Sequence, residues 1–125
     1  MKKVLIAFDV DGTLRSNKDD TDPHPSLSSG AVPFANEEIR SLLIILSKFK
    51  NVEILVWSGS GELYARQISS ALGISKYVDK YAGKWITAED GMGVRQPHPD
   101  IQPDIAIDDI QDCILGKINL IVKQK

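Results

Sequence analysis

The chain has 125 residues, 42% of them hydrophobic and 26% charged, which is ordinary for one soluble globular domain with a single core. Its formal net charge of −2 argues against a basic face for non-specific nucleic-acid binding, although a small local basic patch stays open. The single cysteine, Cys113, excludes an internal disulfide, and no apolar run is long enough to cross a membrane. We therefore expect one cytoplasmic domain over residues 1–125, with Cys113 as a small buried residue.

A continuous apolar run at residues 4–8 ends in two carboxylates, Asp9 and Asp11, followed by Gly12-Thr13. Apolar runs of this length that stop at a glycine turn are typical of strands buried on both faces, and hence central in a parallel sheet. The two carboxylates then stand where the strand runs out into a loop, which is the edge at which open α/β sheets bind ligands.

Two segments are too rich in turn residues to form regular structure. Residues 15–33 hold three aspartates and three prolines, and a loop of this length is uncommon in a compact domain unless it has a function. It is either a flap that folds over the strand end or a disordered excursion. Residues 86–103 hold two glycines and three prolines, so we expect an irregular loop with at most a turn of helix or a small hairpin.

Helix and strand patterns alternate between these two loops. Apolar residues recur at helical spacing over residues 36–50, with Asn36 as the expected N-cap and acidic side chains in the first turn. A β-branched run at residues 52–56 indicates a second buried strand, which leads through Trp57-Ser58-Gly59-Ser60-Gly61 into a helix over residues 62–72. Backbone N–H groups at such a helix start point outward, so this Ser/Gly turn is a candidate phosphate site.

The C-terminal part adds short elements only. In chain order they are a short strand or pair of turns within residues 74–83, a strand at 105–107 that ends in Asp108-Asp109, a helical turn at 112–115 and a last strand at 118–122. This alternation predicts an α/β fold, a Rossmann-like open and mainly parallel sheet with helices on both faces.

Three predicted strands therefore end in acidic, small or polar residues: Asp9/Asp11, Ser58/Gly59 and Asp108/Asp109. In a parallel sheet these ends lie on the same edge, so residues far apart in the sequence converge. A cluster of three or four carboxylates needs a cation to stay packed and ionised, and hard oxygen ligands suit Mg²⁺.

The stretch Asp9-Val10-Asp11-Gly12-Thr13 resembles DxDGT, the first motif of the haloacid dehalogenase-like (HAD) phosphohydrolases. The resemblance implies that Asp9 is the nucleophile and a Mg²⁺ ligand. It also implies that Asp11 is the general acid and base and ligates the metal through its backbone carbonyl. As an acid Asp11 must start protonated, which a crowded acidic neighbourhood favours.

The later motifs follow in the family's order. Ser58, at the end of the second strand and followed by Gly59, is similar to the second motif, which implies a phosphate-binding pair. Asp108-Asp109 is similar to the last motif, with Asp108 as a direct Mg²⁺ ligand and Asp109 as a second ligand or outer-shell group. With no room for a cap domain, the chain resembles the small capless type.

The third motif of the family supplies a lysine that neutralises the nucleophile and the phosphoryl oxygens. Lys84, after Tyr81-Ala82-Gly83, is our choice, because a short strand that ends in Gly-Lys fits small family members. Lys80, Lys76 and Arg95 remain candidates. The stretch Gln96-Pro97-His98-Pro99 is similar to another form of this motif but has glutamine in place of lysine.

The resemblance implies a Mg²⁺-dependent phosphatase that acts through an aspartyl-phosphate, in which Asp9 and Asp11 do the chemistry and Ser58 and Lys84 hold the phosphoryl group. Its substrate is a phosphorylated small molecule or the end of a macromolecule; nucleic acid is not indicated by the charge, and the oligomeric state stays open. A two-component receiver domain fits poorly, because the strand at residues 52–56 ends without an acid. The alternative is an inactive HAD-fold module that only binds or regulates.

Overall fold

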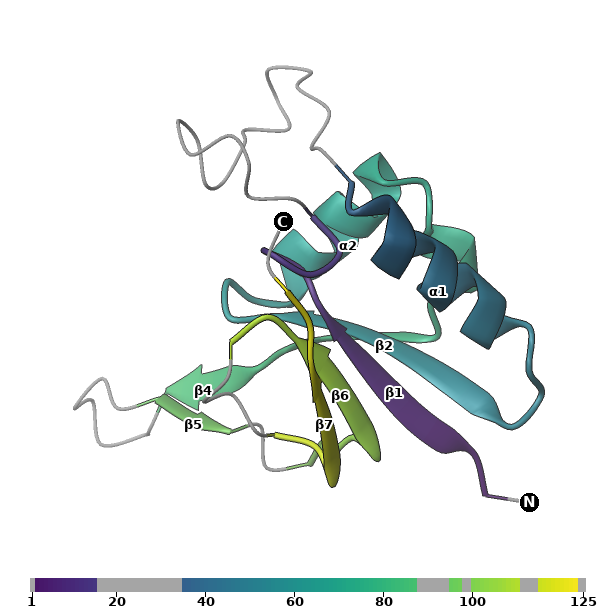
Figure 1. Cartoon of the computed structure of the whole chain (residues 1–125). Helices are drawn as coiled ribbons and strands as arrows, with labels where there is room; N and C mark the ends of the chain where they lie inside the picture. The colour runs from purple at the N-terminus through teal and green to yellow at the C-terminus, as the bar shows by residue number, and fades with distance from the viewer. Residues whose placement is uncertain (1, 16–34, 88–94, 98–99, 111–114, 124–125) are drawn as a thin grey trace.

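A sheet of five parallel strands forms the centre of the computed structural model, which describes residues 2–15, 35–87, 95–97, 100–110 and 115–123 (Figure 1). The strand order is β3 (Lys80–Gly83), β2 (Val52–Ser58), β1 (Val4–Asp9), β6 (Ile105–Asp108) and β7 (Ile118–Ile121). The prediction of an α/β fold built on a parallel sheet is confirmed.

The central strand β1 is buried on both faces, as its apolar sequence predicts. Ala7 and Phe8 point to opposite faces and neither is exposed to solvent. Burying a side chain of the size of Phe8 contributes roughly 1.5–3 kcal/mol relative to leaving it exposed. This burial fixes the register, because a slip by one residue would turn every side chain of β1 to the other face.

The two described helices, α1 (Glu37–Ser47) and α2 (Glu62–Ala71), lie on one face of the sheet (Figure 1). Leu43 of α1 and Ile68 of α2 belong to the same core cluster as Phe8 of β1. Among the described residues, helices therefore cover one face of the sheet only, and helices on the other face stay a prediction.

The direction of the crossovers explains this arrangement. Connections between parallel strands are nearly always right-handed, so the steps from β1 to β2 and from β2 to β3 place both helices on one face. The steps from β3 to β6 and from β6 to β7 run the opposite way along the sheet. The same rule assigns crossovers in that direction to the other face. In the first of these, β4 (Trp85–Thr87) and β5 (Arg95–Pro97) pair antiparallel, which confirms the small hairpin allowed for residues 86–103.

The helix ends differ in detail from the sequence-based expectation. Helix α1 ends at Ser47 rather than near residue 50, and Asn36 occupies the N-cap position without making a side-chain capping hydrogen bond. Helix α2 is followed by Leu72 and by Gly73, whose φ of 72° is the left-handed conformation expected after a helix end. A 3₁₀ turn, η2 (Ser75–Tyr77), then leads into β3.

Some predictions fall outside the described residues: positions 16–33 of the expected flap and positions 112–114 of the expected helical turn, including Cys113. Within the described part of the chain, no helix has the length and apolar character needed to span a membrane.

Candidate functional site

The turn after β1 sets the position of the first two aspartates. Asp9 is the last residue of β1, and the backbone then closes on itself through hydrogen bonds from Arg15 N to Val10 O (2.9 Å) and from Gly12 N to Arg15 O (2.8 Å). Gly12 has a φ of 82°, a conformation that side-chain-bearing residues rarely adopt. This turn explains why glycine follows the second carboxylate of the DxDGT stretch.

The turn after β2 brings Ser58 to the same edge of the sheet. The Ser58 side chain is buried, and its Oγ accepts a hydrogen bond from the backbone N–H of Ser60 at 3.0 Å. Gly61, with a φ of 105°, then starts α2. Its Cα lies only 3.5 Å from where a Cβ on Gly83 would stand, so the loops after β2 and β3 approach each other closely.

Lys84 follows β3 directly and reaches into the centre of this edge. Its backbone N–H donates to Ser58 O at 3.0 Å, and its Nζ lies 2.6 Å from Asp9 Oδ1 and 2.5 Å from Asp108 Oδ2. The three side chains are only 4–8% exposed. The strand register explains the meeting, because Phe8 pairs with Ile107 and the next residue on each strand is an aspartate.

Burial and charge act against each other in this cluster. Burial raises the pKa of Asp9 to about 8, helped by Asp108 and opposed by Lys84. Burial likewise raises the pKa of Asp109 above its usual value. Burial disfavours the charge of Lys84, but the adjacent Asp9 and Asp108 outweigh it and hold the pKa of Lys84 above its usual value. The site therefore holds excess negative charge that one ammonium does not fully balance.

Three carboxylates form a group that could hold a metal ion. One oxygen each from Asp9, Asp108 and Asp109 lies within 4.8 Å of the others. The Thr13 hydroxyl lies between two of them, 3.2 Å from Asp9 Oδ2 and 3.5 Å from Asp109 Oδ1. The three carboxylates carry more negative charge than the Lys84 ammonium can balance, and their oxygens are hard donors. Both properties fit a divalent cation such as Mg²⁺.

Asp11 lies apart from this group of carboxylates. Its Oδ1 accepts a hydrogen bond from Tyr64 OH at 2.7 Å and one from Arg15 Nη1 at 3.1 Å. Burial and the bond to Asp11 raise the pKa of Tyr64 above its usual value, which keeps this hydroxyl a donor. The group of carboxylates that could hold a metal ion does not include Asp11, and the crowded acidic neighbourhood expected around Asp11 stays a prediction. Its backbone carbonyl as a metal ligand stays a prediction.

Two of the other cations considered for the third motif, Lys80 and Lys76, lie elsewhere. Lys80 pairs with Glu53 at 2.8 Å. It is the first residue of β3 and lies three residues before Gly83, at the far end of the strand from Lys84. Lys76 stands over the Tyr77 ring, 5.1 Å from its centroid. The side chain of Arg95 is outside the described part of the structure. Among the three candidates whose side chains the structure describes, Lys84 is the one that lies at the carboxylates.

Sequence reasoning assigned no role to Thr13, Arg15 or Tyr64, which all contact the aspartates. Thr13 was visible as part of the DxDGT stretch. The position of Tyr64 is explained equally well by packing on the apolar face of α2. Only the rule that a buried tyrosine hydroxyl needs a hydrogen-bond partner could have indicated a role at the site. Nothing in the local pattern distinguishes Arg15 from a surface cation.

Neither models of known protein families nor curated proteins match this chain. The fold and the side-chain geometry therefore carry the functional argument.

Proposed function

We propose that the chain is a Mg²⁺-dependent phosphohydrolase of the HAD-like type that forms an aspartyl-phosphate on Asp9. The single observation that carries the proposal is the position of the Lys84 ammonium, 2.6 Å from Asp9 Oδ1 and 2.5 Å from Asp108 Oδ2. A buried nucleophile, a lysine and a cation-binding pair of acids on one sheet edge are the parts that phosphoryl transfer to a carboxylate requires.

The order of the strands adds support at the level of the fold. Strands β3, β2 and β1 lie on one side, and the chain then continues on the other side with β6 and β7. A Rossmann-like doubly wound sheet would have this change of direction, and in such sheets ligands bind where the direction of winding reverses, which supports the proposal. That point lies between β1 and β6, where Asp9 and Asp108 meet.

In the proposed reaction, one Asp9 carboxylate oxygen attacks phosphorus and the bond from phosphorus to the leaving oxygen breaks. Lys84 orients the Asp9 carboxylate and offsets negative charge on the transferred group. Thr13 helps to fix the second Asp9 oxygen through its hydroxyl. Mg²⁺, held by Asp9, Asp108 and Asp109, would supply further charge neutralisation at the phosphoryl oxygens.

The loop after β2 is the proposed cradle for the phosphoryl oxygens. Ser58 Oγ already accepts from the N–H of Ser60, so its hydroxyl hydrogen can be donated to a phosphoryl oxygen. Backbone N–H groups at the start of α2 add donors, as helix N-termini do for phosphates. Gly59, exposed beside Trp85, lets the substrate approach the backbone closely.

Asp11 is the proposed proton carrier, giving a proton to the leaving oxygen and later taking one from the water that hydrolyses the aspartyl-phosphate. Its carboxylate is oriented by Tyr64 and Arg15. Because this acid assists an oxygen leaving group, the proposal favours phosphate esters over halides. The described residues hold no cap domain, so the proposed site suits phosphorylated small molecules or exposed phosphorylated ends of macromolecules.

The test is hydrolysis of p-nitrophenyl phosphate with and without Mg²⁺, comparing wild type with Asp9→Asn. We expect turnover that depends on Mg²⁺ and falls at least about 10³-fold in the variant, because the nucleophile is lost. The matched control is Asp79→Asn, an aspartate at the other end of the sheet that accepts a backbone N–H, which should retain turnover. Metal-independent turnover, or turnover retained in Asp9→Asn, would overturn the proposal; no turnover on any phosphorylated compound would favour the binding module.

A further inference from the structure

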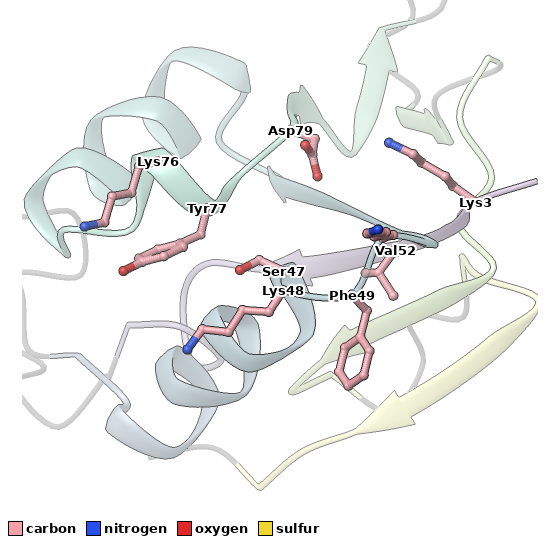
Figure 2. Close-up of a pocket in the computed structure, with 9 residues that line it drawn as sticks. Lys3, Ser47, Lys48, Phe49, Val52, Lys76, Tyr77 and Asp79 are labelled. Atoms are coloured by element: carbon pink, nitrogen blue, oxygen red, sulfur yellow. The ribbon is translucent and has the colours of Figure 1, made fainter.

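A hollow of about 370 Å³ opens at the opposite end of the sheet from the candidate site (Figure 2). It is bordered by the residue before β1, the end of α1, the start of β2 and the turn η2. Its volume lies at the lower end of the range of about 300–1,000 Å³ that is typical of small-molecule sites. The described structure therefore offers a concave surface away from the acidic edge.

Four lysines line this basic hollow: Lys3, Lys48, Lys50 and Lys76. All four are exposed, and Figure 2 shows Lys3 on one side of the hollow and Lys48 and Lys76 on the other. This concentration of positive charge stands out in a chain whose formal net charge is −2. Such a cluster attracts anions, and most strongly those with several charges.

The single carboxylate in the lining does not neutralise these lysines. Asp79 Oδ2 accepts a hydrogen bond from the backbone N–H of Ile54 at 2.8 Å, and Asp79 N donates to Ile54 O at 2.9 Å. These bonds direct the Asp79 side chain toward β2. None of the four lysines of the hollow forms a salt bridge with a described residue.

Two aromatic side chains accompany the charges. Phe49, between Lys48 and Lys50, is 54% exposed, and Tyr77 is half-buried with its ring centroid 5.1 Å from Lys76 Nζ. One exposed phenylalanine is normal on a protein surface. Beside a set of cations, however, it offers a face on which a nucleobase can stack.

The basic hollow and the candidate active site are too far apart to hold one phosphoryl group. Strand β2 joins them, with Val52 in the lining of the hollow and Ser58 in the site. Six residue steps at about 3.3 Å each separate the two by roughly 20 Å. A ligand in the hollow is therefore distinct from the group that reacts at Asp9.

We propose that the basic hollow binds a nucleoside triphosphate, with the triphosphate among Lys3, Lys48, Lys50 and Lys76 and the base against Phe49. The charge of a triphosphate complements the four ammonium groups, and its size suits the hollow. A long nucleic-acid strand would extend beyond the lysines over a chain of net negative charge, which opposes binding. This binding does not depend on the proposed phosphatase activity.

The test measures binding of adenosine triphosphate, tripolyphosphate and a short oligothymidylate to the full chain without divalent cations, by calorimetry and amide NMR shifts. We expect adenosine triphosphate to bind and to shift the amide signals of Lys48, Phe49 and Tyr77. The double variant Lys48→Ala/Lys76→Ala should bind at least about tenfold more weakly, since each exposed charge pair contributes about fivefold. Phe49→Ala should weaken the binding of adenosine triphosphate about fivefold but leave the affinity for tripolyphosphate unchanged.

The matched control is Lys117→Ala/Lys123→Ala, which removes two exposed lysines that do not line the hollow. It should leave the affinity unchanged, and thermal melts of all variants check that each is folded. The proposal would be overturned by equal losses of affinity in both double variants or by amide shifts centred on Asp9 and Ser58. It would also be overturned if adenosine triphosphate did not bind below about 10 mM. Tighter binding of the oligothymidylate than of adenosine triphosphate would also overturn it and assign the surface to nucleic acid.

Discussion

At the amino-terminal edge of the sheet, Asp79 and Asp104 each form hydrogen bonds with the backbone of a neighbouring strand. At the carboxyl-terminal edge, by contrast, Asp9, Asp108 and Asp109 face one another. Asp104 N donates to Leu5 O at 2.9 Å, and Asp104 Oδ2 accepts from Leu5 N at 2.9 Å. Asp79 makes the same pair of bonds with Ile54 of β2. Each aspartate precedes a shorter strand by one residue and fastens it to a longer one.

The pKa of Asp104 at one edge and that of Asp9 at the other move in opposite directions. The backbone N–H of Leu5 holds the pKa of Asp104 below its usual value, whereas burial raises the pKa of Asp9 to about 8. A carboxylate that is partly exposed and bound by backbone donors stabilises the fold directly. Buried carboxylates that repel one another oppose folding unless a cation joins them, and that makes the second edge the candidate for function.

Two lysines at the ends of β3 give the largest test of this contrast, because Lys80 is its first residue and Lys84 follows its last. Lys84→Met leaves the buried Asp9 and Asp108 without their ammonium, and we expect the free energy of unfolding to fall by about 3–5 kcal/mol. Lys80→Met breaks an exposed pair with Glu53 at the other edge and should cost about 0.2–1 kcal/mol. Urea unfolding without metal measures both. Equal losses would remove the distinction between the edges.

The pH dependence of stability is the next largest effect. The folded pKa of Asp9, about 8, exceeds its ordinary value of 3.8, so between these values the folded chain holds a proton that the unfolded chain has lost. Stability without metal should therefore fall as pH rises through this window, by at most about 1.4 kcal/mol per pH unit for one proton. Asp9→Asn removes this titration and should flatten the curve, although Asp109 keeps a smaller slope of the same sign.

Urea unfolding in a chelating agent between about pH 5 and about pH 8 measures this slope in wild type and in Asp9→Asn. Adding Mg²⁺ to the wild type should restore stability at the upper end, because a bound cation replaces the proton. A curve that rises with pH in the wild type relative to Asp9→Asn would contradict the raised pKa of Asp9.

Asp11 is the exception at the carboxyl-terminal edge, since its carboxylate is not part of the group of three and accepts hydrogen bonds from Tyr64 and Arg15. Tyr64→Phe removes the 2.7 Å hydrogen bond but keeps the ring, so the free energy of unfolding should fall by about 1 kcal/mol. If Tyr64 positions Asp11 for proton transfer, kcat should fall about tenfold and the pH optimum should move. Tyr81→Phe, whose ring also packs on the core, is the matched control. An unchanged pH–rate profile in Tyr64→Phe would leave Tyr64 a packing residue.

The sequence predicts this edge well because its signals are local. Apolar runs that end in Asp9, Ser58 and Asp108 mark strand ends, and a parallel sheet brings strand ends together. The choice between Lys80 and Lys84 does not follow from local signals. The two lysines are only four residues apart in the sequence, but they lie at opposite edges of the sheet. The pairing of Leu55 with Lys80 and of Ser58 with Gly83 decides it, and such register depends on residues distant in sequence.

The contacts of Tyr64, Arg15 and Asp104 could not be predicted for the same reason. Helical periodicity places Tyr64 on the inner face of α2 but does not specify that its hydroxyl meets Asp11. The helices expected on the second face depend on what the returning crossovers contain, and the described part of those connections holds β4 and β5 instead. Local patterns specify elements, whereas crossovers and side-chain partners depend on the assembled sheet.

The smallest expected effect concerns Asp104, and it has the opposite sign to that of Asp9. Its folded pKa lies below the ordinary 3.8, so its contribution to stability is present above that value and is lost as pH falls through the folded pKa. Asp104→Asn keeps an oxygen that can accept from Leu5 N but removes the charge. In urea unfolding the variant should be slightly less stable than wild type at about pH 7, and the difference should shrink as the pH falls below the ordinary pKa of 3.8. A difference that widens in acid would mean that Asp104 does not stabilise the sheet through its charge, and the contrast between the two edges would then lie only in the buried carboxylates.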